Sequence, residues 1–188
     1  INFTGLNKTL TQSGGTLTNT KINWTIVDGA SLTLNNNLPV ATNRSLIVGG
    51  GTSGALDCGA YLVSGAGAFT LASGATLKTA STTGVAGSIT VTGTKTLSSA
   101  ANYEFNGSLA QFTGSLLPAT VNNLTINNAA GVSLSQSVAV TGVLTQTSGK
   151  LAIGDNTLTV NGSCLGDATN SLSGGSTSNL SITVAAPN

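Results

Sequence analysis

Histidine is absent from this sequence of 188 residues, and charged residues make up only 6% of it. Without histidine, the chain lacks the commonest general base, the commonest metal ligand and every serine–histidine or cysteine–histidine dyad. Its acidic residues are dispersed as Asp28, Asp57, Glu104, Asp155 and Asp167, and none stands in a close pair with another. The paired carboxylates of a glycosidase would have to be assembled from distant parts of the fold. The sequence therefore predicts a protein that is not an enzyme and holds no metal or cofactor.

Charge of either sign is scarce, and the formal net charge is only +1. The basic residues are scattered singly as Lys8, Lys21, Arg44, Lys78, Lys95 and Lys150. A nucleic acid or an acidic membrane surface calls for a basic cluster, which this sequence lacks. No apolar run approaches the length of a membrane-spanning helix. We therefore expect neither nucleic-acid binding nor membrane insertion.

Aromatic residues are only 4% of the chain and methionine is absent, whereas 39% of the residues are hydrophobic. The core must therefore be built from Leu, Val, Ile and Ala, which suit thin and regular layers. Thr, Ser, Asn and Gly supply the polar surface in place of charge. Such side chains stack one above another without like-charge repulsion, and Thr and Asn can hydrogen-bond along a ladder. This composition is typical of short stacked strands.

One short pattern recurs along the chain, in which two apolar residues alternate with Thr, Ser or Asn before a Gly or Asn. It reads SLTLNN at 31–36, SITVTG at 88–93, NLTINN at 123–128, TLTVNG at 157–162 and NLSI at 179–182. Alternation with a period of two predicts strands with one apolar and one polar face. Strands are expected at 16–19, 22–27, 31–34, 45–48, 60–63, 68–72, 76–78, 88–92, 103–105, 123–126, 132–134, 138–140, 143–146, 150–153, 157–160 and 179–183. Gly and Asn interrupt every helical pattern, so no helix is expected.

Strands this short, with varied turns between them, favour a right-handed parallel β-helix over the alternative, an antiparallel β-sandwich. Each coil would contribute two or three strands. With about 20 to 25 residues in each coil, residues 1–188 would form a single β-solenoid domain of roughly eight coils. Residues 120–130 and 176–186 are similar at an offset of 56 positions, which two or three coils would fill.

Three kinds of side chain have an expected direction in such a solenoid. Cys58 and Cys164 should lie several coils apart, beyond the reach of a disulfide, and two buried free thiols that fill space in the core are favoured. A disulfide would require the chain to fold back on itself or a partner chain to supply the other sulfur. Trp24 is in phase with its apolar neighbours and is expected to point inward. Glu104 alternates with aromatic neighbours and is expected to point outward into solvent.

Threonine pairs of the form Thr-x-Thr are candidate contacts of a flat surface that binds ice or a glycan. The pairs considered are Thr90 and Thr92, Thr145 and Thr147, and Thr157 and Thr159. An ice-binding plane needs such a pair in every coil and in register, and these pairs are irregularly spaced. The other interpretation is the ordinary preference of threonine for the polar face of a strand.

Three segments carry a resemblance to a known family: ANYEFNGSLAQFTG at 101–114, LPATVNNLTINN at 117–128 and NTLTVNG at 156–162. They are similar to the repeat segments of large type IX-secreted, cell-surface or adhesin-like proteins of Bacteroidota. The resemblance is clear over residues 101–184. The first hundred residues share only the general character of these repeats. It implies adhesion or extracellular scaffolding, and the family has no catalytic motif to carry over. Such proteins end in a sorting domain that this sequence lacks, so we expect a segment of a longer protein.

The expected function is that of a non-enzymatic, extracellular structural or adhesive β-solenoid: a stalk, an adhesin segment or a fibre-forming subunit on a bacterial cell surface. Expected partners are copies of the chain stacked end to end, other surface proteins, or glycans. An ice- or glycan-binding module that uses a flat Thr/Ser/Asn face is the alternative. A polysaccharide-processing β-helix enzyme is disfavoured by the single arginine and the dispersed acids.

Overall fold

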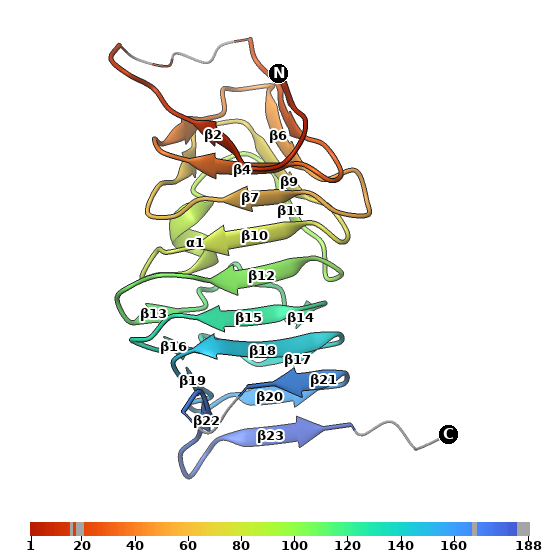
Figure 1. Ribbon diagram of the computed structural model, residues 1–188, viewed down its shortest axis with the longest axis vertical. Helices are drawn as coiled ribbons and strands as arrows, with labels where there is room; N and C mark the ends of the chain where they lie inside the picture. Colours follow the sequence, from red (N-terminus) through yellow and green to blue (C-terminus); the bar gives the residue numbers. More distant parts are fainter. Residues whose placement is uncertain (16, 18–20, 167–168, 184–188) are drawn as a thin grey trace.

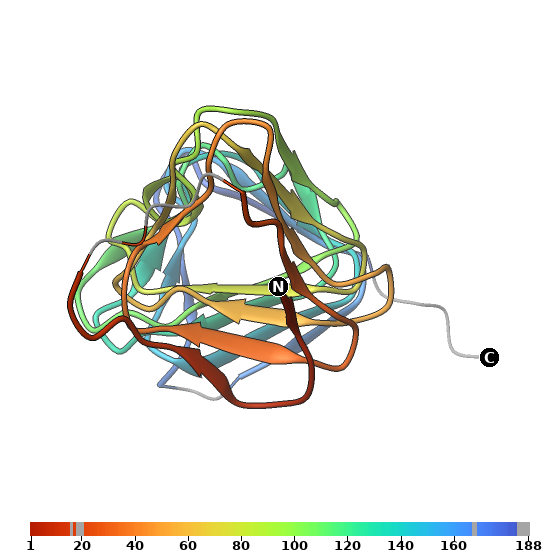
Figure 2. The same ribbon diagram turned by 90° about the horizontal axis from the view of Figure 1, so that it is seen from above.

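The computed structural model of the chain describes residues 1–15, 17, 21–166 and 169–183. The chain winds into a column of stacked coils, with its first and last strands at opposite ends (Figure 1) and a triangular outline along the column (Figure 2). Every strand pairing among the described residues is parallel. The prediction of a parallel β-helix of about eight coils is confirmed, and the antiparallel sandwich is excluded.

Each coil has up to three sides, and strands of successive coils pair side by side into sheets. Sheet B runs the whole length and contains β2 (Lys8–Leu10), β4 (Ser31–Leu34), β7 (Ala55–Asp57), β10 (Thr76–Thr79), β12 (Asn102–Phe105), β15 (Leu124–Asn127), β18 (Val143–Ser148) and β21 (Ser163–Leu165). Along the chain, a strand of sheet A precedes sheet B in the N-terminal coils, and a strand of sheet E does so in the C-terminal coils. The strands that follow sheet B belong to sheet C and then to sheet D.

The four shorter sheets have the following members. Sheet A contains β1 (Asn2–Phe3), β3 (Trp24–Ile26), β6 (Ser45–Val48), β9 (Ala68–Leu71) and β11 (Lys95–Leu97). Sheet E contains β14 (Thr120–Val121), β17 (Val138–Val140), β20 (Thr157–Val160) and β23 (Asn179–Ile182). Sheet C contains β5 (Leu38–Pro39) and β8 (Val63–Ser64), and sheet D contains β13 (Gln111–Phe112), β16 (Val132–Ser133), β19 (Leu151–Ala152) and β22 (Leu172–Ser173).

The core consists of columns of apolar side chains that point into the coils. In sheet B, Leu32 pairs with Leu56, which pairs in turn with Leu77. All three side chains are buried, as is Tyr103 in the next strand of the same column. Burying one such side chain stabilises the fold by about 1.5–3 kcal/mol. The alternating pattern thus places one apolar face of each strand in a continuous core.

The directions expected for Trp24 and Glu104 are confirmed. Trp24 is buried, and the ring of Phe3 stacks on it with the ring centroids 6.0 Å apart. Glu104 occupies an outward position in β12, where its Oε2 lies 2.7 Å from the Nζ of Lys78 in the neighbouring strand. This pairing leaves the Glu104 side chain 17% exposed, so the residue is less solvated than expected.

Both cysteines are free, but they differ in burial. Cys58 is fully buried in the core, as predicted. Burial raises the pKa of its thiol, because desolvation disfavours the thiolate. The prediction of a buried Cys164 is wrong, because this residue is exposed. Cys164 pairs with the buried Leu144 and so continues an inward column, but it belongs to the last strand of sheet B.

A four-residue α-helix, α1 (Val85–Ser88), stands between sheets C and D, so the expectation of no helix is wrong at this point. The strand expected at 88–92 is also wrong. Ser88, the first residue of that expected strand, is the last residue of α1, and Ile89 forms only an isolated bridge with Val63. The first helical N–H donates to the carbonyl of Thr113 at 3.1 Å. Contact with a distant segment therefore overrides the local alternation.

The strands that the sequence did not predict are all two or three residues long: β1, β2, β5, β7, β11, β13, β14, β21 and β22. A segment this short cannot display a period of two, and the coil stacked beside it decides that it pairs. The strand expected at 16–19 lies, apart from Leu17, outside the described residues. The strands expected at 31–34, 45–48 and 157–160 match their observed bounds.

The internal similarity at an offset of 56 positions does not relate equivalent places in the coils. Leu124 and Ile126 of its first copy lie in β15 of sheet B, whereas their counterparts Leu180 and Ile182 lie in β23 of sheet E. Within sheet B, Leu124 pairs with Leu144, 20 residues later, so an offset of 56 is not a whole number of coils. The similarity therefore reflects a strand pattern that suits every side of the solenoid.

A buried amide network stands beside α1, in the part of the column where sheet D begins. Gln111 donates from Nε2 to the carbonyl oxygens of Thr79 at 3.0 Å and Ser81 at 2.9 Å. Its Oε1 accepts from the N–H of Gly107 at 2.8 Å and from Nδ2 of Asn128 at 2.7 Å. Both glutamine amide groups are thus fully used, which is what a polar side chain needs in order to be buried without penalty.

Candidate functional site

The six threonines considered for a flat binding face lie on three different sides of the solenoid. Thr145 and Thr147 are in β18 of sheet B, Thr157 and Thr159 are in β20 of sheet E, and Thr90 and Thr92 follow α1 beside sheet C. The structure therefore brings the members of each pair together but does not bring the three pairs onto one face.

The neighbours of these threonines do not extend them into a regular array. Thr145 pairs with Thr125 on one side and with Leu165 on the other. Thr159 pairs with Ala139 in the preceding coil. Apolar and small residues thus interrupt the threonine columns. The pairs in β18 and β20 lie where threonine is ordinarily found, on the polar face of a strand, whereas Thr90 and Thr92 lie outside the strands.

The acidic side chains that the structure describes hydrogen-bond to, or form ion pairs with, residues of nearby turns and strands. Asp57 accepts from the N–H of Gly59 at 2.9 Å, and Asp155 accepts from the hydroxyl of Thr177. The described part of the chain contains no group of three or more His, Cys, Asp or Glu side chains that could hold a metal ion. It also contains no helix long and apolar enough to cross a bilayer.

Asp28 organises the loop of the next coil. Its Oδ1 accepts from the N–H of Gly50 at 2.7 Å and from the N–H of Ser53 at 3.0 Å. These hydrogen bonds, that of Gly50 first, hold the pKa of Asp28 below its ordinary value, because they favour the ionised form. The carboxylate therefore links two coils at an exposed corner.

We expect Asp28 to make the stability of the protein depend on pH. A lowered pKa in the folded state stabilises the fold above the unfolded pKa, about 3.9, and this contribution is lost as the pH falls through the folded value. In urea unfolding, wild type should exceed Asp28→Asn in stability at pH 6, and the difference should shrink steadily below about pH 4. A difference that stays constant between pH 6 and pH 2 would contradict this role.

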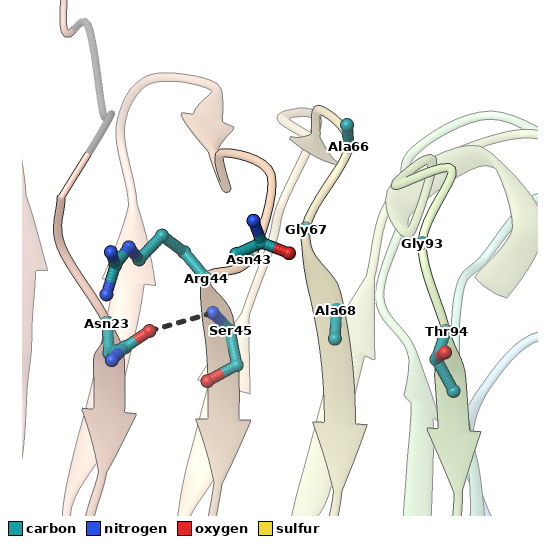
Figure 3. A pocket seen from close by; sticks show the side chains of 9 residues that line it. All are labelled: Asn23, Asn43, Arg44, Ser45, Ala66, Gly67, Ala68, Gly93 and Thr94. Carbon is teal, nitrogen blue, oxygen red and sulfur yellow. Dashed lines mark hydrogen bonds between the residues drawn. The ribbon is translucent and has the colours of Figure 1, made fainter.

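A shallow hollow of about 510 Å³ opens at the corner where the chain enters sheet A (Figure 3). Its lining comes from the beginnings of β3, β6, β9 and β11, which belong to four successive coils. The polar residues in this lining are Asn23, Asn43, Arg44, Ser45 and Thr94. The rest of the lining consists of alanine and glycine. The hollow therefore combines a neutral polar floor with the one arginine of the sequence.

A tight turn places Arg44 at this corner. The N–H of Arg44 donates to the carbonyl of Ala41 at 3.0 Å, and Asn43 takes a positive φ of 61°, which asparagine adopts more readily than most residues. Figure 3 shows the Arg44 side chain extending over Asn23 in the preceding coil. Oδ1 of Asn23 in turn accepts from the N–H of Ser45 at 3.1 Å.

Two glycines of the lining let successive coils stack closely at this corner. A Cβ atom at Gly67 would stand 2.6 Å from the carbonyl oxygen of Arg44, and one at Gly93 would overlap the carbonyl oxygen of Gly67. No side chain fits at either place without moving the backbone. The close stacking of these coil corners therefore depends on the two glycines.

The charge of Arg44 has no counterpart in the hollow. Its Nε–H is enclosed and finds no hydrogen-bond partner among the described residues. None of the residues that line the hollow is acidic. An enclosed donor of a charged group is unfavourable unless an acceptor reaches it. By contrast, the charge of Lys78 is matched by Glu104.

The C-terminal end of the column leaves core positions uncovered. In β23, Leu180 pairs with Leu158, and Ile182 pairs with Val160. Leu158 and Val160 are 0% and 1% exposed, whereas Leu180 and Ile182 are 43% and 53% exposed. Together with Cys164, these two side chains continue inward columns to the end of the stack. We call these three residues the C-terminal end face.

The N-terminal end of the column has a different chemistry. Lys8 of β2 pairs with the buried Leu32, so a lysine stands where the inward column of sheet B would place an apolar residue. On the adjacent side, Phe3 lies over Trp24. A charge at an inward edge position is a common device against further strand addition. The two ends of the solenoid are therefore not equivalent.

Comparisons with known protein families, with curated proteins and with solved structures found no match. The proposals below therefore rest on the geometry of the chain and on the resemblance described above. Neither the hollow nor the end face was predicted from the sequence. A signal for the hollow does exist, since Arg44 is followed by Gly67 and Gly93 at intervals close to one coil.

Proposed function

We propose that this chain is a non-enzymatic structural segment of an extracellular stalk or adhesin, to which further coils are added at the C-terminal end. The observation that carries the proposal is the C-terminal end face, where Leu180 and Ile182 continue core columns into solvent. An exposed strand edge with apolar neighbours is a template for another strand. The resemblance of residues 101–184 to repeats of surface proteins supports the extracellular role.

The N-terminal end favours a stalk segment over a fibre that polymerises head to tail. Docking that end onto the apolar C-terminal end face would bury Lys8 without a partner, which is costly. In a solution of the isolated chain, the C-terminal end face of a second copy offers an apolar partner without a lysine at an inward position. We therefore expect pairs joined at their C-terminal ends, which do not grow into longer filaments.

Sedimentation equilibrium over a range of concentrations tests this proposal. The wild-type chain should form dimers, and Leu180→Asp and Ile182→Asp should weaken dimerisation by at least about tenfold, because each puts a charge into the interface. Leu165→Asp is the matched control. Leu165 is also an exposed leucine of the last coil, but it pairs with Thr145 and points outward.

Two results would contradict the proposed association. One is a wild-type chain that stays monomeric at every concentration. The other is an equal loss of dimers in Leu165→Asp and Leu180→Asp. Antibody labelling of intact source cells tests the surface location separately, and labelling that requires lysis would contradict it.

A further inference from the structure

We propose that the hollow beside Arg44 binds the carboxylate of an acidic sugar, such as a uronic acid residue of a polysaccharide. This binding activity goes beyond a structural role, and it does not depend on how the coils associate. It makes the solenoid a carrier of a glycan site on one of its corners. The ligand class follows from the shape, the charge and the lining of the hollow.

The charge of the hollow selects an anion. Arg44 supplies a guanidinium whose Nε–H is without an acceptor, and no acid lines the hollow to neutralise it. A planar guanidinium matches a carboxylate through two parallel hydrogen bonds, which makes arginine well suited to this group. A ligand carboxylate in the hollow would pair with the terminal Nη groups of the guanidinium, since the enclosed Nε–H is out of its reach.

The lining of the hollow selects a sugar over an apolar acid. The side chains of Asn23, Asn43, Ser45 and Thr94 offer neutral donors and acceptors that suit hydroxyl groups. No aromatic residue and no large aliphatic residue takes part in the lining. The volume of about 510 Å³ falls within the usual range of small-molecule sites, about 300–1,000 Å³, although the hollow is shallow.

The hollow is also preformed. Gly67 and Gly93 pack closely against the backbone of the preceding coil, and the turn before Arg44 is held by a backbone hydrogen bond. A ligand therefore needs no rearrangement of the corner in order to enter. Because the attraction is mainly electrostatic and the site is open, binding should be modest and should weaken as salt is added.

Isothermal titration of the full chain with trigalacturonate at low ionic strength tests the assignment. We expect trigalacturonate to bind, maltotriose to bind at least about tenfold more weakly, and a sulfated disaccharide to bind more weakly than trigalacturonate. Absence of trigalacturonate binding at millimolar concentrations would overturn the proposal. Equal binding of maltotriose or of the sulfated sugar would overturn the carboxylate assignment.

Variants of the corner locate the site. Arg44→Gln should weaken trigalacturonate binding at least about tenfold, and Arg44→Lys should retain part of it, because lysine keeps the charge without the planar fork. Lys150→Gln removes an exposed cation outside the hollow and is the matched control, expected to bind as wild type does. Equal binding by wild type and Arg44→Gln would overturn the proposal.

Asn23→Asp keeps the test valid if Arg44→Gln fails to fold. An aspartate at this position can still accept from the N–H of Ser45, so the local structure is preserved. Its carboxylate would stand beneath the Arg44 guanidinium and neutralise it from within. We expect trigalacturonate binding to fall at least about tenfold in a variant that remains folded. Undiminished binding in folded Asn23→Asp would overturn the proposal.

Discussion

Replacing Gly149 with alanine is expected to lower the free energy of unfolding by about 4 kcal/mol or more, a large part of the 5–15 kcal/mol of a typical domain. Gly149 has a φ of 78°, and its N–H donates to Oδ1 of Asn170 in the next coil at 2.8 Å. A Cβ atom there would overlap the carbonyl oxygen of Asn128. Because that oxygen belongs to the backbone, no change of rotamer can relieve the contact.

Gly29 offers a matched control for this substitution. It has a similar φ of 74°, and its N–H also donates to a side chain of the next coil, the hydroxyl of Ser53 at 2.7 Å. A Cβ atom at Gly29 would meet nothing within 4 Å. Gly29→Ala should therefore lower the free energy of unfolding by only about 1–2 kcal/mol, the cost of placing alanine in a left-handed backbone conformation. Urea unfolding measures both variants, and equal losses at the two positions would contradict the importance of coil stacking at Gly149.

Replacing Gln111 with leucine is expected to lower the free energy of unfolding by about 2–4 kcal/mol. The substitution removes all four hydrogen bonds of the amide and leaves the carbonyls of Thr79 and Ser81 without this donor. It also leaves Nδ2 of Asn128 with one acceptor fewer. The Gly107 N–H loses the acceptor that Oε1 supplied, and the other three buried groups each keep only their remaining hydrogen bond. The loss comes from these hydrogen bonds, since the volume of the side chain is nearly unchanged.

Gln146 is the matched control for Gln111. It is also a buried glutamine, but its Oε1 has no hydrogen-bond partner among the described residues. Gln146→Leu removes this unpaired acceptor and is expected to be neutral or to stabilise the fold. The urea midpoints of the two variants, each compared with wild type, show whether the loss depends on the hydrogen bonds that the buried amide makes. A loss at Gln146 as large as that at Gln111 would rule out this explanation.

The alternation of the longer strands was enough to predict the solenoid and the direction of most side chains. Cys164 shows where such a prediction ends. The pattern places this residue in an inward column, but burial also needs a following coil, and the alternation of a single strand carries no information about its neighbour. The same holds for Leu180, whose pattern is that of a core residue although it is exposed.

The functional sites were harder to predict, because they depend on which residues the coils bring side by side. The coils differ in length: Leu32 pairs with Leu56 after 24 residues, and Leu124 pairs with Leu144 after 20. The threonine pairs therefore fall on different sides of the solenoid. For the same reason, the grouping of Arg44 with the glycines of later coils becomes visible only once the register is known.

Hydrogen exchange at increasing protein concentration tests most directly whether the C-terminal end of the solenoid is the end that accepts further coils. We predict that protection of backbone amides in β21, β22 and β23 rises with concentration, whereas β1 and β2 exchange at the same rate throughout. Exchange in β21 to β23 that does not change with concentration, or protection that rises at β1 and β2 instead, would contradict this account.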